Sequence, residues 1–290
     1  MGICRGHSDF NINGDIQDEA FISIFDHGFL FGDSIYEVVC TNKGNPCFLD
    51  EHLIRLYESA SGISLEIPNT SKEIKEQIQN TLNSAENDES YIRIIVTRGI
   101  GEVDIDPSSC LNPNIIIFVK GIPQIPAESY RKGVSIALVS IKRNSADSLN
   151  PAVKTGNYLN NVLARIEAQK MGAEDAIMVN SLGQLTEGTT SNLFFVKGGR
   201  LLTPVKECGI LSGITREKII QIAHKNGITL EEGKWSSEEL FNAEEIFLSG
   251  TVKKIMPVTV LDNRPVGKGI PGPITQKIMK LYSELLDSLD

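Results

Sequence analysis

A proline-containing stretch near the middle of the chain limits how the protein can fold. The sequence Lys120-Gly-Ile-Pro-Gln-Ile-Pro-Ala-Glu-Ser129 follows an apolar strand candidate, Ile115–Val119. Its two prolines cannot lie in a central strand, and its composition is typical of an interdomain linker. The chain has 290 residues, which exceeds the size of a typical single core. We therefore expect two domains, residues 1–119 and 134–290, joined by a linker at residues 120–133.

The pattern of apolar residues predicts both strands and helices in the first half. Phe10–Ile16 is typical of a hairpin, because Asn13-Gly14 favours a two-residue turn. Thr70 and Glu73 have the spacing of a capping box and predict the start of a helix, since apolar residues then recur every four positions. Further strands are expected at Ile35–Val39, Tyr91–Thr97 and Ile115–Val119, and a further helix at Asp50–Ala60.

Strands and helices also mix in the second half, without a regular alternation of one strand with one helix. Asn157–Met171 is predicted to be an amphipathic helix, with an apolar face that carries Leu159, Val162, Leu163, Ile166 and Met171. Further helices are expected at Ile214–His224 and Thr275–Leu286. The expected strands are Val134–Ile141, Ala176–Val179, Asn192–Val196, Arg200–Leu202 and Glu245–Ser249. This mixture indicates an α/β or α+β protein.

Charge and composition argue against several classes of function. The net charge is −9, and no basic run interrupts the acidity, so a nucleic-acid surface is not expected. The five cysteines are scattered and the four histidines lack metal-ligand spacing, which favours a reduced, metal-free, cytoplasmic protein. Residues 1–15 lack the apolar core of a signal peptide, and no segment approaches the roughly 20 apolar residues of a membrane span. Glycine-rich phosphate loops are absent, so any phosphate must be bound by helix ends and single basic residues.

Two residues have surroundings that suit catalysis, although each also has an ordinary explanation. Lys154 lies between a strand-like approach and the start of a predicted helix, in Asn150-Pro-Ala-Val-Lys-Thr-Gly-Asn-Tyr158. A lysine that reacts with a carbonyl needs a rigid tether and a lowered pKa, and the helix start would disfavour its charged form. Glu187 could pair with a protonated pyridine nitrogen. The alternatives are a solvated loop lysine and an exposed turn acid.

Two turns and two arginines could bind anionic groups. The backbone N–H groups of Ile214 and Thr215, at a predicted helix start, form a ready anion site, unless Ser212 or Thr215 is an ordinary cap. Ser249-Gly-Thr-Val252 offers a second turn with free N–H groups. Arg55 could supply a fixed cation for a phosphate, or could be a solvated arginine on a helix face. Arg93 alternates within an apolar strand and therefore needs a partner.

Together these segments resemble the class IV aminotransferases, over nearly the whole chain and in the order of that family. The segments that carry the resemblance are Asp26-His-Gly-Phe-Leu-Phe-Gly-Asp-Ser-Ile-Tyr-Glu37, His52-Leu-Ile-Arg-Leu56, Ala152-Val-Lys154 with Asn157-Tyr-Leu159, Leu185-Thr-Glu-Gly-Thr-Thr-Ser-Asn192, Gly213-Ile-Thr-Arg216 and Ser249-Gly-Thr251. The resemblance implies a fold-type IV enzyme that uses pyridoxal 5'-phosphate. It also implies a small N-terminal α/β domain, a larger C-terminal domain with a pseudo-barrel sheet, and a homodimer.

The resemblance also implies a role for each residue of the site. Lys154 would carry the cofactor and then move the proton between the substrate Cα and the cofactor C4′. Glu187 would pair with the ring nitrogen, and Tyr158 would approach the ring hydroxyl. The implied cofactor-binding residues are Arg55, Lys154, Tyr158, Glu187, Ile214, Thr215 and Thr251. The implied substrate-binding residues are Tyr36, Arg93, Arg98, Thr251 and Val252.

The substrate expected from the resemblance is an L-branched-chain amino acid, with 2-oxoglutarate as acceptor. The Arg-x-His clamp of the D-amino acid branch is absent from the loop after Thr97-Arg-Gly99, which carries acids instead. Tyr91-Ile-Arg93 is similar to the strand of the branched-chain enzymes, although Ile94 stands where those enzymes have proline. An aliphatic pocket is expected beside this strand, with Phe29, Phe31 and Ile35 adding apolar surface. The alternatives are a D-amino acid or (R)-amine transaminase, an aminodeoxychorismate lyase-like enzyme, and a non-catalytic interaction protein.

Overall fold

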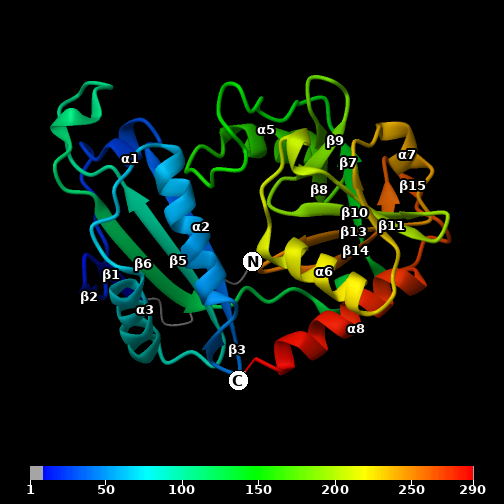
Figure 1. The fold of residues 1–290 in the computed structure, drawn as a ribbon, viewed down its shortest axis with the longest axis horizontal. Helices are drawn as coiled ribbons and strands as arrows, with labels where there is room; N and C mark the ends of the chain where they lie inside the picture. Colours follow the sequence, from blue (N-terminus) through cyan, green and yellow to red (C-terminus); the bar gives the residue numbers. More distant parts are fainter. Residues whose placement is uncertain (1–8, 290) are drawn as a thin grey trace. The chain divides into compact units, whose positions relative to one another are not determined.

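The computed structural model describes residues 9–289. In it, the first hairpin of the chain forms the edge of an antiparallel sheet. This sheet has six strands in the described residues, in the order β2-β1-β6-β5-β3-β4 (Figure 1). The strands are β1 (Asp9–Ile12), β2 (Asp15–Gln17), β3 (Ser34–Asn42), β4 (Asn45–Pro46), β5 (Ser90–Thr97) and β6 (Asn114–Gly121). Asn13 and Gly14 both have positive φ, as a two-residue hairpin turn requires, and this confirms the predicted hairpin.

Two helices cover one face of this sheet and enclose its core. They are α2 (Leu49–Gly62) and α3 (Ser71–Ala85), and short helices α1 (His27–Leu30) and η1 (Pro107–Ser109) lie in the connections. Leu53, Leu56, Ile74 and Ile78 from the helices are buried with alternate residues of β3, β5 and β6. The predicted capping box is confirmed, because Thr70 and Glu73 hydrogen-bond reciprocally at the start of α3.

The strands of the second half form a larger sheet that closes on itself. In the described residues it has nine strands in the order β12-β11-β10-β13-β14-β7-β8-β9, with β15 paired to β14. Its strands are β7 (Val134–Leu138), β8 (Asp175–Val179), β9 (Leu185–Gly188), β10 (Asn192–Lys197), β11 (Arg200–Pro204), β12 (Leu230–Gly233), β13 (Glu245–Gly250), β14 (Lys254–Leu261) and β15 (Arg264–Pro265). Strand β9 also pairs with β10, so the strands from β10 through β9 form a closed ring. The expected fold, a small N-terminal sheet domain and a larger C-terminal barrel domain, is confirmed.

Helices surround this barrel and connect its strands. They are α4 (Ala127–Lys132), α5 (Leu159–Lys170), η2 (Lys206–Cys208), α6 (Ile214–Lys225), α7 (Ser237–Phe241) and α8 (Pro273–Asp287). None of the helices in residues 9–289 has the length and apolar character needed to cross a membrane. Helices α1, α4 and α7 and strands β4, β9, β12, β14 and β15 were not predicted from the sequence.

Contacts within the chain divide the described residues into two compact units. Unit 1 comprises residues 9–123, 153–157 and 289, and unit 2 comprises residues 124–152 and 158–288. The proline-containing stretch therefore contains the first change of unit, between Pro123 and Gln124. Two differences from the expected linker are that β6 continues to Gly121 and that α4 occupies Ala127–Lys132. Residues 153–157, which include Lys154, return to unit 1 from within the second half of the sequence.

Helix α5 forms where the sequence predicts it, but its large apolar residues point outward. Leu159, Val162, Leu163 and Ile166 are exposed. The buried positions include Ala164 and Ala168, which pack against Ala137, Val139, Ala176 and Met178. Small side chains allow the helix to approach the sheet closely, and the larger apolar residues then remain on the opposite face. The predicted apolar face of this helix is therefore its exposed face, and the alanines form the side that packs against the sheet.

Strand β14 contains a proline in the middle of a sheet, where proline is rarely found. Pro257 pairs with Phe247 of β13, but pairing of β14 with β7 on its other side begins only at Val258. The N–H that proline lacks is therefore not needed for the ladder with β7. This explains how a Pro-containing sequence forms an interior strand, and why the sequence pattern did not reveal it.

Candidate active site

Lys154 is held by backbone hydrogen bonds at the edge of the unit 1 sheet. Its N–H donates to Ser59 Oγ at 3.1 Å, and its carbonyl accepts the N–H of Tyr36 at 3.0 Å. Two residues later, the N–H of Gly156 donates to the carbonyl of Ser34 at 2.8 Å. The segment therefore extends the sheet beside the start of β3, which gives the lysine the rigid tether that the sequence analysis required.

The side chain of Lys154 lies against Tyr36, next to Arg93. Its Nζ is 3.3 Å from the Tyr36 hydroxyl and 4.3 Å from the centre of the Tyr36 ring. Arg93 Cζ is 4.0 Å from the same ring centre, and Arg93 Nη1 donates to the Tyr91 hydroxyl at 3.4 Å. Both cations are attracted by the π-electrons of the ring. The structure thus brings together three of the predicted site residues, and it supplies the partner that Arg93 needed.

Side chains alternate between the two faces of the sheet along β3 and β5, and this places Tyr36 and Arg93 on the face away from the helices. In β5, Ile92 and Ile94 are buried in the core, whereas Arg93 and Ile95 are half-buried. In β3, Ile35 is fully buried in the same core. Ile35 therefore cannot contribute apolar surface to a pocket beside Arg93, and that expectation is wrong. Phe29 and Phe31 are exposed.

On the helix-covered face, Glu37 forms a buried network with His52 and Arg55. Glu37 has no exposed surface. Its carboxylate accepts hydrogen bonds from Arg55 Nε at 2.7 Å, from Arg55 Nη2 at 2.8 Å and from His52 Nδ1 at 2.7 Å. Burial alone would raise the pKa of Glu37, but Arg55 and His52 outweigh it and lower that pKa to about 2. Burial also lowers the pKa of His52. Arg55 is buried in this pair, so it is not a solvated helix-face arginine, and its contact with a phosphate stays a prediction.

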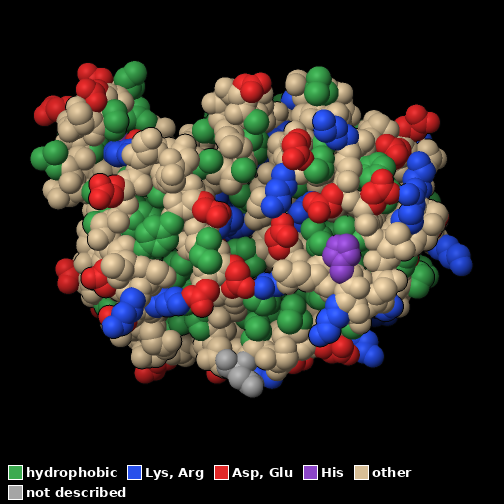
Figure 2. All heavy atoms as spheres, in the orientation of Figure 1, with side chains coloured by type: hydrophobic (Ala, Val, Ile, Leu, Met, Phe, Trp, Pro, Cys, Tyr) green, Lys and Arg blue, Asp and Glu red, His purple; other side chains and the backbone are tan. Residues whose placement is uncertain are grey.

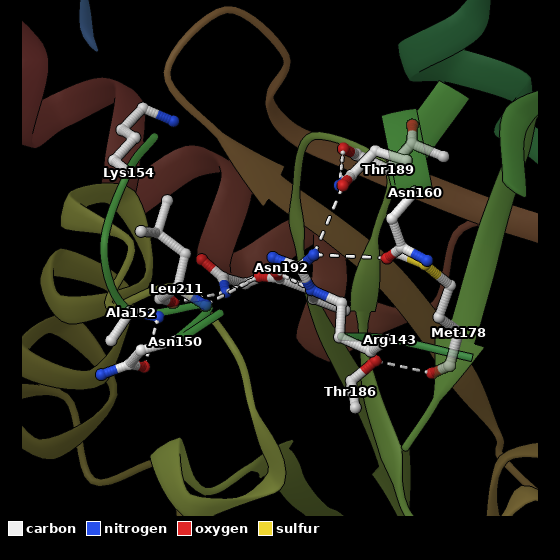
Figure 3. Close-up of polar contacts among 12 residues, drawn as sticks. Arg143, Asn150, Ala152, Lys154, Asn160, Met178, Thr186, Thr189, Asn192 and Leu211 are labelled. Carbon is white, nitrogen blue, oxygen red and sulfur yellow. Dashed lines mark hydrogen bonds and ion pairs between the residues drawn. The ribbon is translucent and has the colours of Figure 1, made fainter. Parts of the chain in front are cut away.

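In unit 2, Glu187 is a buried carboxylate with four N–H groups directed at it. Only 5% of its surface is exposed. Its Oε1 accepts a hydrogen bond from Arg143 Nε at 3.0 Å and lies 2.9 Å from Arg143 Nη2. Its Oε2 accepts hydrogen bonds from Asn192 Nδ2 at 3.3 Å and from the N–H of Leu211 at 3.0 Å. Figure 3 shows Arg143, Asn192 and Leu211 in this network. The alternative of an exposed turn acid is therefore wrong.

Arg143 and Asn192 were missed by the sequence analysis as site residues. Arg143 lies in an irregular segment after β7, where no periodicity marks its direction, and it also donates to Asn160 Oδ1 at 3.5 Å and Asn161 Oδ1 at 3.3 Å. The available signal was indirect: if Glu187 is buried as an ion, it needs a cation nearby. Nothing in the sequence around Arg143 identifies it as that cation.

The start of helix α6 is connected to the same network. Asn192 Nδ2 donates to the carbonyl of Leu211 at 2.9 Å, and a Cβ at Gly213 would lie 2.0 Å from Asn192 Oδ1. A side chain there would displace the Asn192 amide, and with Gly213 as N-cap the helix begins without a side-chain hydrogen bond from that residue. Ile214 and Thr215 follow it and are buried. A buried helix start whose N-cap is glycine is suited to an anionic group.

The remaining predicted residues lie in a turn, at a helix start and in a loop. Thr251 and Val252 are half-buried in the turn between β13 and β14, close to Ser249, whose buried Oγ has no hydrogen-bond partner within the described residues. Tyr158 is half-buried at the N-cap of α5.

Arg98 pairs with Asp33 at 2.8 Å and donates to two backbone carbonyls of the segment after α2. Its guanidinium thus holds a loop, and a contact with substrate has no support in these interactions.

These residues fit the chemical needs of pyridoxal 5'-phosphate. Taken by itself, unit 1 contains a tethered amine. Taken by itself, unit 2 contains a buried carboxylate of the kind that pairs with a protonated pyridine nitrogen. Unit 2 also contains a buried helix start with glycine at its N-cap and a turn next to the unpartnered Ser249 hydroxyl, groups of the kind that can bind a phosphate. Within the described residues, no cluster of three or more histidine, cysteine or acidic side chains could hold a metal ion.

Comparison with known proteins gives one consistent family. Residues 34–261 match the family model for amino-transferase class IV. A provisionally named branched-chain-amino-acid aminotransferase of Methanocaldococcus jannaschii is 38% identical, over 94% of this chain and 95% of that protein. The D-alanine aminotransferase of Bacillus licheniformis is 33% identical, over 90% of both chains. The solved structure of a T.th. branched-chain amino acid aminotransferase with pyridoxamine 5'-phosphate matches with a TM-score of 0.90 and 30% identity, over 96% of this chain and 93% of that one.

The low pKa of Glu37 predicts a specific dependence of stability on pH. In the unfolded chain this carboxyl has its ordinary pKa of 4.5, and in the folded protein the pKa is about 2. Between these values the unfolded state binds more protons, so the stabilisation is complete above pH 4.5 and is lost as the pH falls towards 2. The shift corresponds to about 3 kcal/mol. The difference in free energy of unfolding between the wild type and Glu37→Gln should therefore shrink across this range.

Urea unfolding followed by circular dichroism at several pH values measures this difference. Glu58→Gln is the matched control, because Glu58 lies on the same helix as His52 and Arg55 but is exposed. Its difference from the wild type is the reference against which the change for Glu37→Gln is compared. A constant difference for Glu37→Gln over the same range would show that the Glu37 pKa is not lowered.

Proposed function

Because this chain belongs to the class IV aminotransferases and is a pyridoxal-phosphate-dependent enzyme, we propose that it transfers the amino group of L-branched-chain amino acids to 2-oxoglutarate. Lys154 is the lysine that carries the cofactor in this proposal. The observation that carries it is the position of Lys154 Nζ, 3.3 Å from the Tyr36 hydroxyl, on a tether of backbone hydrogen bonds. The adjacent Arg93 supplies a cation on the same face of the sheet.

The proposal gives each residue a task suited to its surroundings. When bound, pyridoxal phosphate supplies an electron sink for negative charge that develops at the substrate Cα. With the cofactor bound, Lys154 would be the base that moves the proton of the substrate Cα, and its backbone hydrogen bonds would hold the amine in place for this task. Glu187 stays ionised beside Arg143 and holds the proton on the ring nitrogen. The N–H groups of Ile214 and Thr215, the Thr251 hydroxyl and Arg55 bind the phosphate, and Tyr158 contacts the ring hydroxyl.

Two features favour the branched-chain substrate class over the D-amino acid class. Arg98, the cation that could have accepted a carboxylate from the loop, is engaged with Asp33 and with backbone carbonyls. Val38 and Ile95 lie on the same sheet face as Tyr36, half-buried, and offer apolar contact to an aliphatic side chain. The substrate carboxylate is then bound by Tyr36, Arg93 and the Thr251–Val252 turn.

A D-amino acid transaminase is the second candidate for this site. The similarity to the Bacillus licheniformis D-alanine aminotransferase over 90% of the chain favours it. The cofactor chemistry and the role of Lys154 are the same in both candidates, so only the substrate class separates them.

We also propose that the enzyme acts as a homodimer. In unit 1, exposed apolar residues gather in two neighbouring segments, which the backbone pair Asp26–Ile100 joins. These residues are Phe21, Ile22, Ile24, Phe25, Phe29, Phe31, Ile100, Val103, Ile105 and Leu111. Figure 2 shows hydrophobic side chains among acidic ones on the loop that contains η1. Unit 2 exposes the apolar face of α5. Apolar patches of this kind favour association, and a second copy of the chain is the partner that covers them.

Lys154 should be the residue that carries the cofactor. Reduction of the holoenzyme with borohydride, followed by peptide mapping, should place the pyridoxyl group on the peptide that contains Lys154. Lys154→Ala should lose transaminase activity and keep its circular dichroism spectrum. The matched control is Lys142→Ala, a lysine outside the proposed site, which should retain activity. A pyridoxyl group on any other lysine would refute the assignment.

The substrate class can be decided by steady-state kinetics with paired enantiomers. L-leucine, L-isoleucine and L-valine, with 2-oxoglutarate as acceptor, should have a higher kcat/KM than L-alanine. An aliphatic side chain gains about 0.8 kcal/mol per buried CH₂ group, which corresponds to roughly fourfold in kcat/KM. If D-alanine turns over faster than L-leucine, the branched-chain proposal is wrong and the D-amino acid candidate takes its place.

The homodimer can be tested by sedimentation equilibrium. The wild type should sediment as a dimer, and Leu163→Glu, on the exposed face of α5, should shift it towards monomer because a charge would be buried in the interface. Leu182→Glu is the matched control, since Leu182 is also an exposed leucine and lies in the β8–β9 turn, away from α5 in the sequence. A wild type that remains monomeric at micromolar concentration contradicts this proposal.

A further inference from the structure

An ion pair in unit 2 joins two segments that carry proposed site residues. Asp175 is the first residue of β8 and is buried, with 2% of its surface exposed. Lys253 lies in the β13–β14 turn, directly after Thr251 and Val252. Its Nζ donates to Asp175 Oδ2. A lysine in a turn does not ordinarily reach a buried carboxylate, so this turn has a side-chain anchor in the body of the barrel.

The other contacts of Asp175 connect it to the segment that carries Glu187. Asp175 Oδ1 accepts Thr189 Oγ1 at 2.6 Å and the N–H of Ala176 at 2.9 Å, and Arg165 Nη1 lies 3.5 Å away. Thr189 follows β9 directly, two residues after Glu187. Burial would raise the pKa of Asp175, but Lys253 and these hydrogen bonds outweigh it and lower that pKa. One ionised carboxylate therefore holds both the end of β9 and the β13–β14 turn.

The backbone of the turn packs against the same part of the barrel. The carbonyl of Lys253 accepts the Tyr130 hydroxyl at 3.1 Å. A Cβ at Gly250 would lie 3.2 Å from the carbonyl of Thr190, so the turn sits close to the loop after β9. The next residue, Lys254, is exposed and forms no ion pair within residues 9–289. The anchor is thus specific to one of two adjacent lysines.

We propose that the Asp175–Lys253 ion pair is a positioning element, which fixes the Ser249–Val252 turn for binding of the cofactor phosphate and the substrate carboxylate. The inference rests on the proposed function, which assigns those contacts to Thr251 and Val252. The pair touches neither ligand. Its effect is to reduce the freedom of the turn before binding, so that less conformational entropy is lost when the phosphate is bound.

The test compares binding of pyridoxal phosphate and of pyridoxal, which lacks the phosphate, to the apoenzyme by isothermal titration calorimetry. Lys253→Met should weaken binding of pyridoxal phosphate about tenfold, which is typical of one lost charge-assisted contact. Binding of pyridoxal should not change. Lys253→Arg should restore most of the affinity for pyridoxal phosphate, because it restores the charge. Lys254→Met is the matched control and should bind both compounds as the wild type does.

Kinetics of the holoenzyme at saturating cofactor give a second measurement. Lys253→Met should raise KM for the 2-oxo acid and leave kcat within about twofold, since the anchor acts on binding of the carboxylate and not on proton transfer.

Two results would overturn the inference. One is unchanged binding in Lys253→Met. The other is an equal loss of affinity for pyridoxal phosphate and pyridoxal together with a lower apoenzyme Tm, which would mean that the pair only stabilises the barrel. Failure of the proposed function is distinct, because faster turnover of D-alanine than of L-leucine would overturn the substrate class and leave the effect of Lys253→Met on binding of pyridoxal phosphate unchanged.

Discussion

The pairing of Glu187 with Asn192 is the interaction on which the second unit depends. It is the backbone pair that joins β9 to β10 and closes the ring of strands. The Asn192 side chain also donates to the Glu187 carboxylate and to the carbonyl of Leu211, just before α6. A buried carboxylate is costly unless its charge is matched, and Arg143 supplies the match. The same few groups therefore close the barrel, hold the Glu187 carboxylate and fix the start of α6.

The first unit uses the two faces of one strand for different purposes. Tyr36 and Glu37 are adjacent in β3, so their side chains point to opposite faces of the sheet. Glu37 is sealed under α2 with His52 and Arg55, where its charge is fully compensated. Tyr36 faces the other way and meets Lys154 and Arg93. Adjacent residues of one strand therefore connect the buried network on one face to the Lys154 side chain on the other.

Local patterns were sufficient for most helices and strands and for several site residues. The Asn13-Gly14 hairpin and the Thr70–Glu73 capping box were predicted because both depend on short-range geometry. The resemblance of short motifs identified the family, and the match of residues 34–261 to amino-transferase class IV confirms it. Tyr36, Arg93 and Lys154, predicted separately, lie together in unit 1.

By itself, the sequence predicted most helices and strands and the change of unit near Pro123. It also singled out Lys154 and Glu187 as candidate site residues. It could do so because backbone turns, caps and hydrophobic periods depend on neighbouring residues. Only the tertiary structure decided that α5 turns its alanines inward, that Arg143 is the partner of Glu187, and that Lys253 and not Lys254 reaches Asp175. Each of these depends on side chains brought together from distant parts of the chain, where burial and charge pairing select one partner among many similar residues.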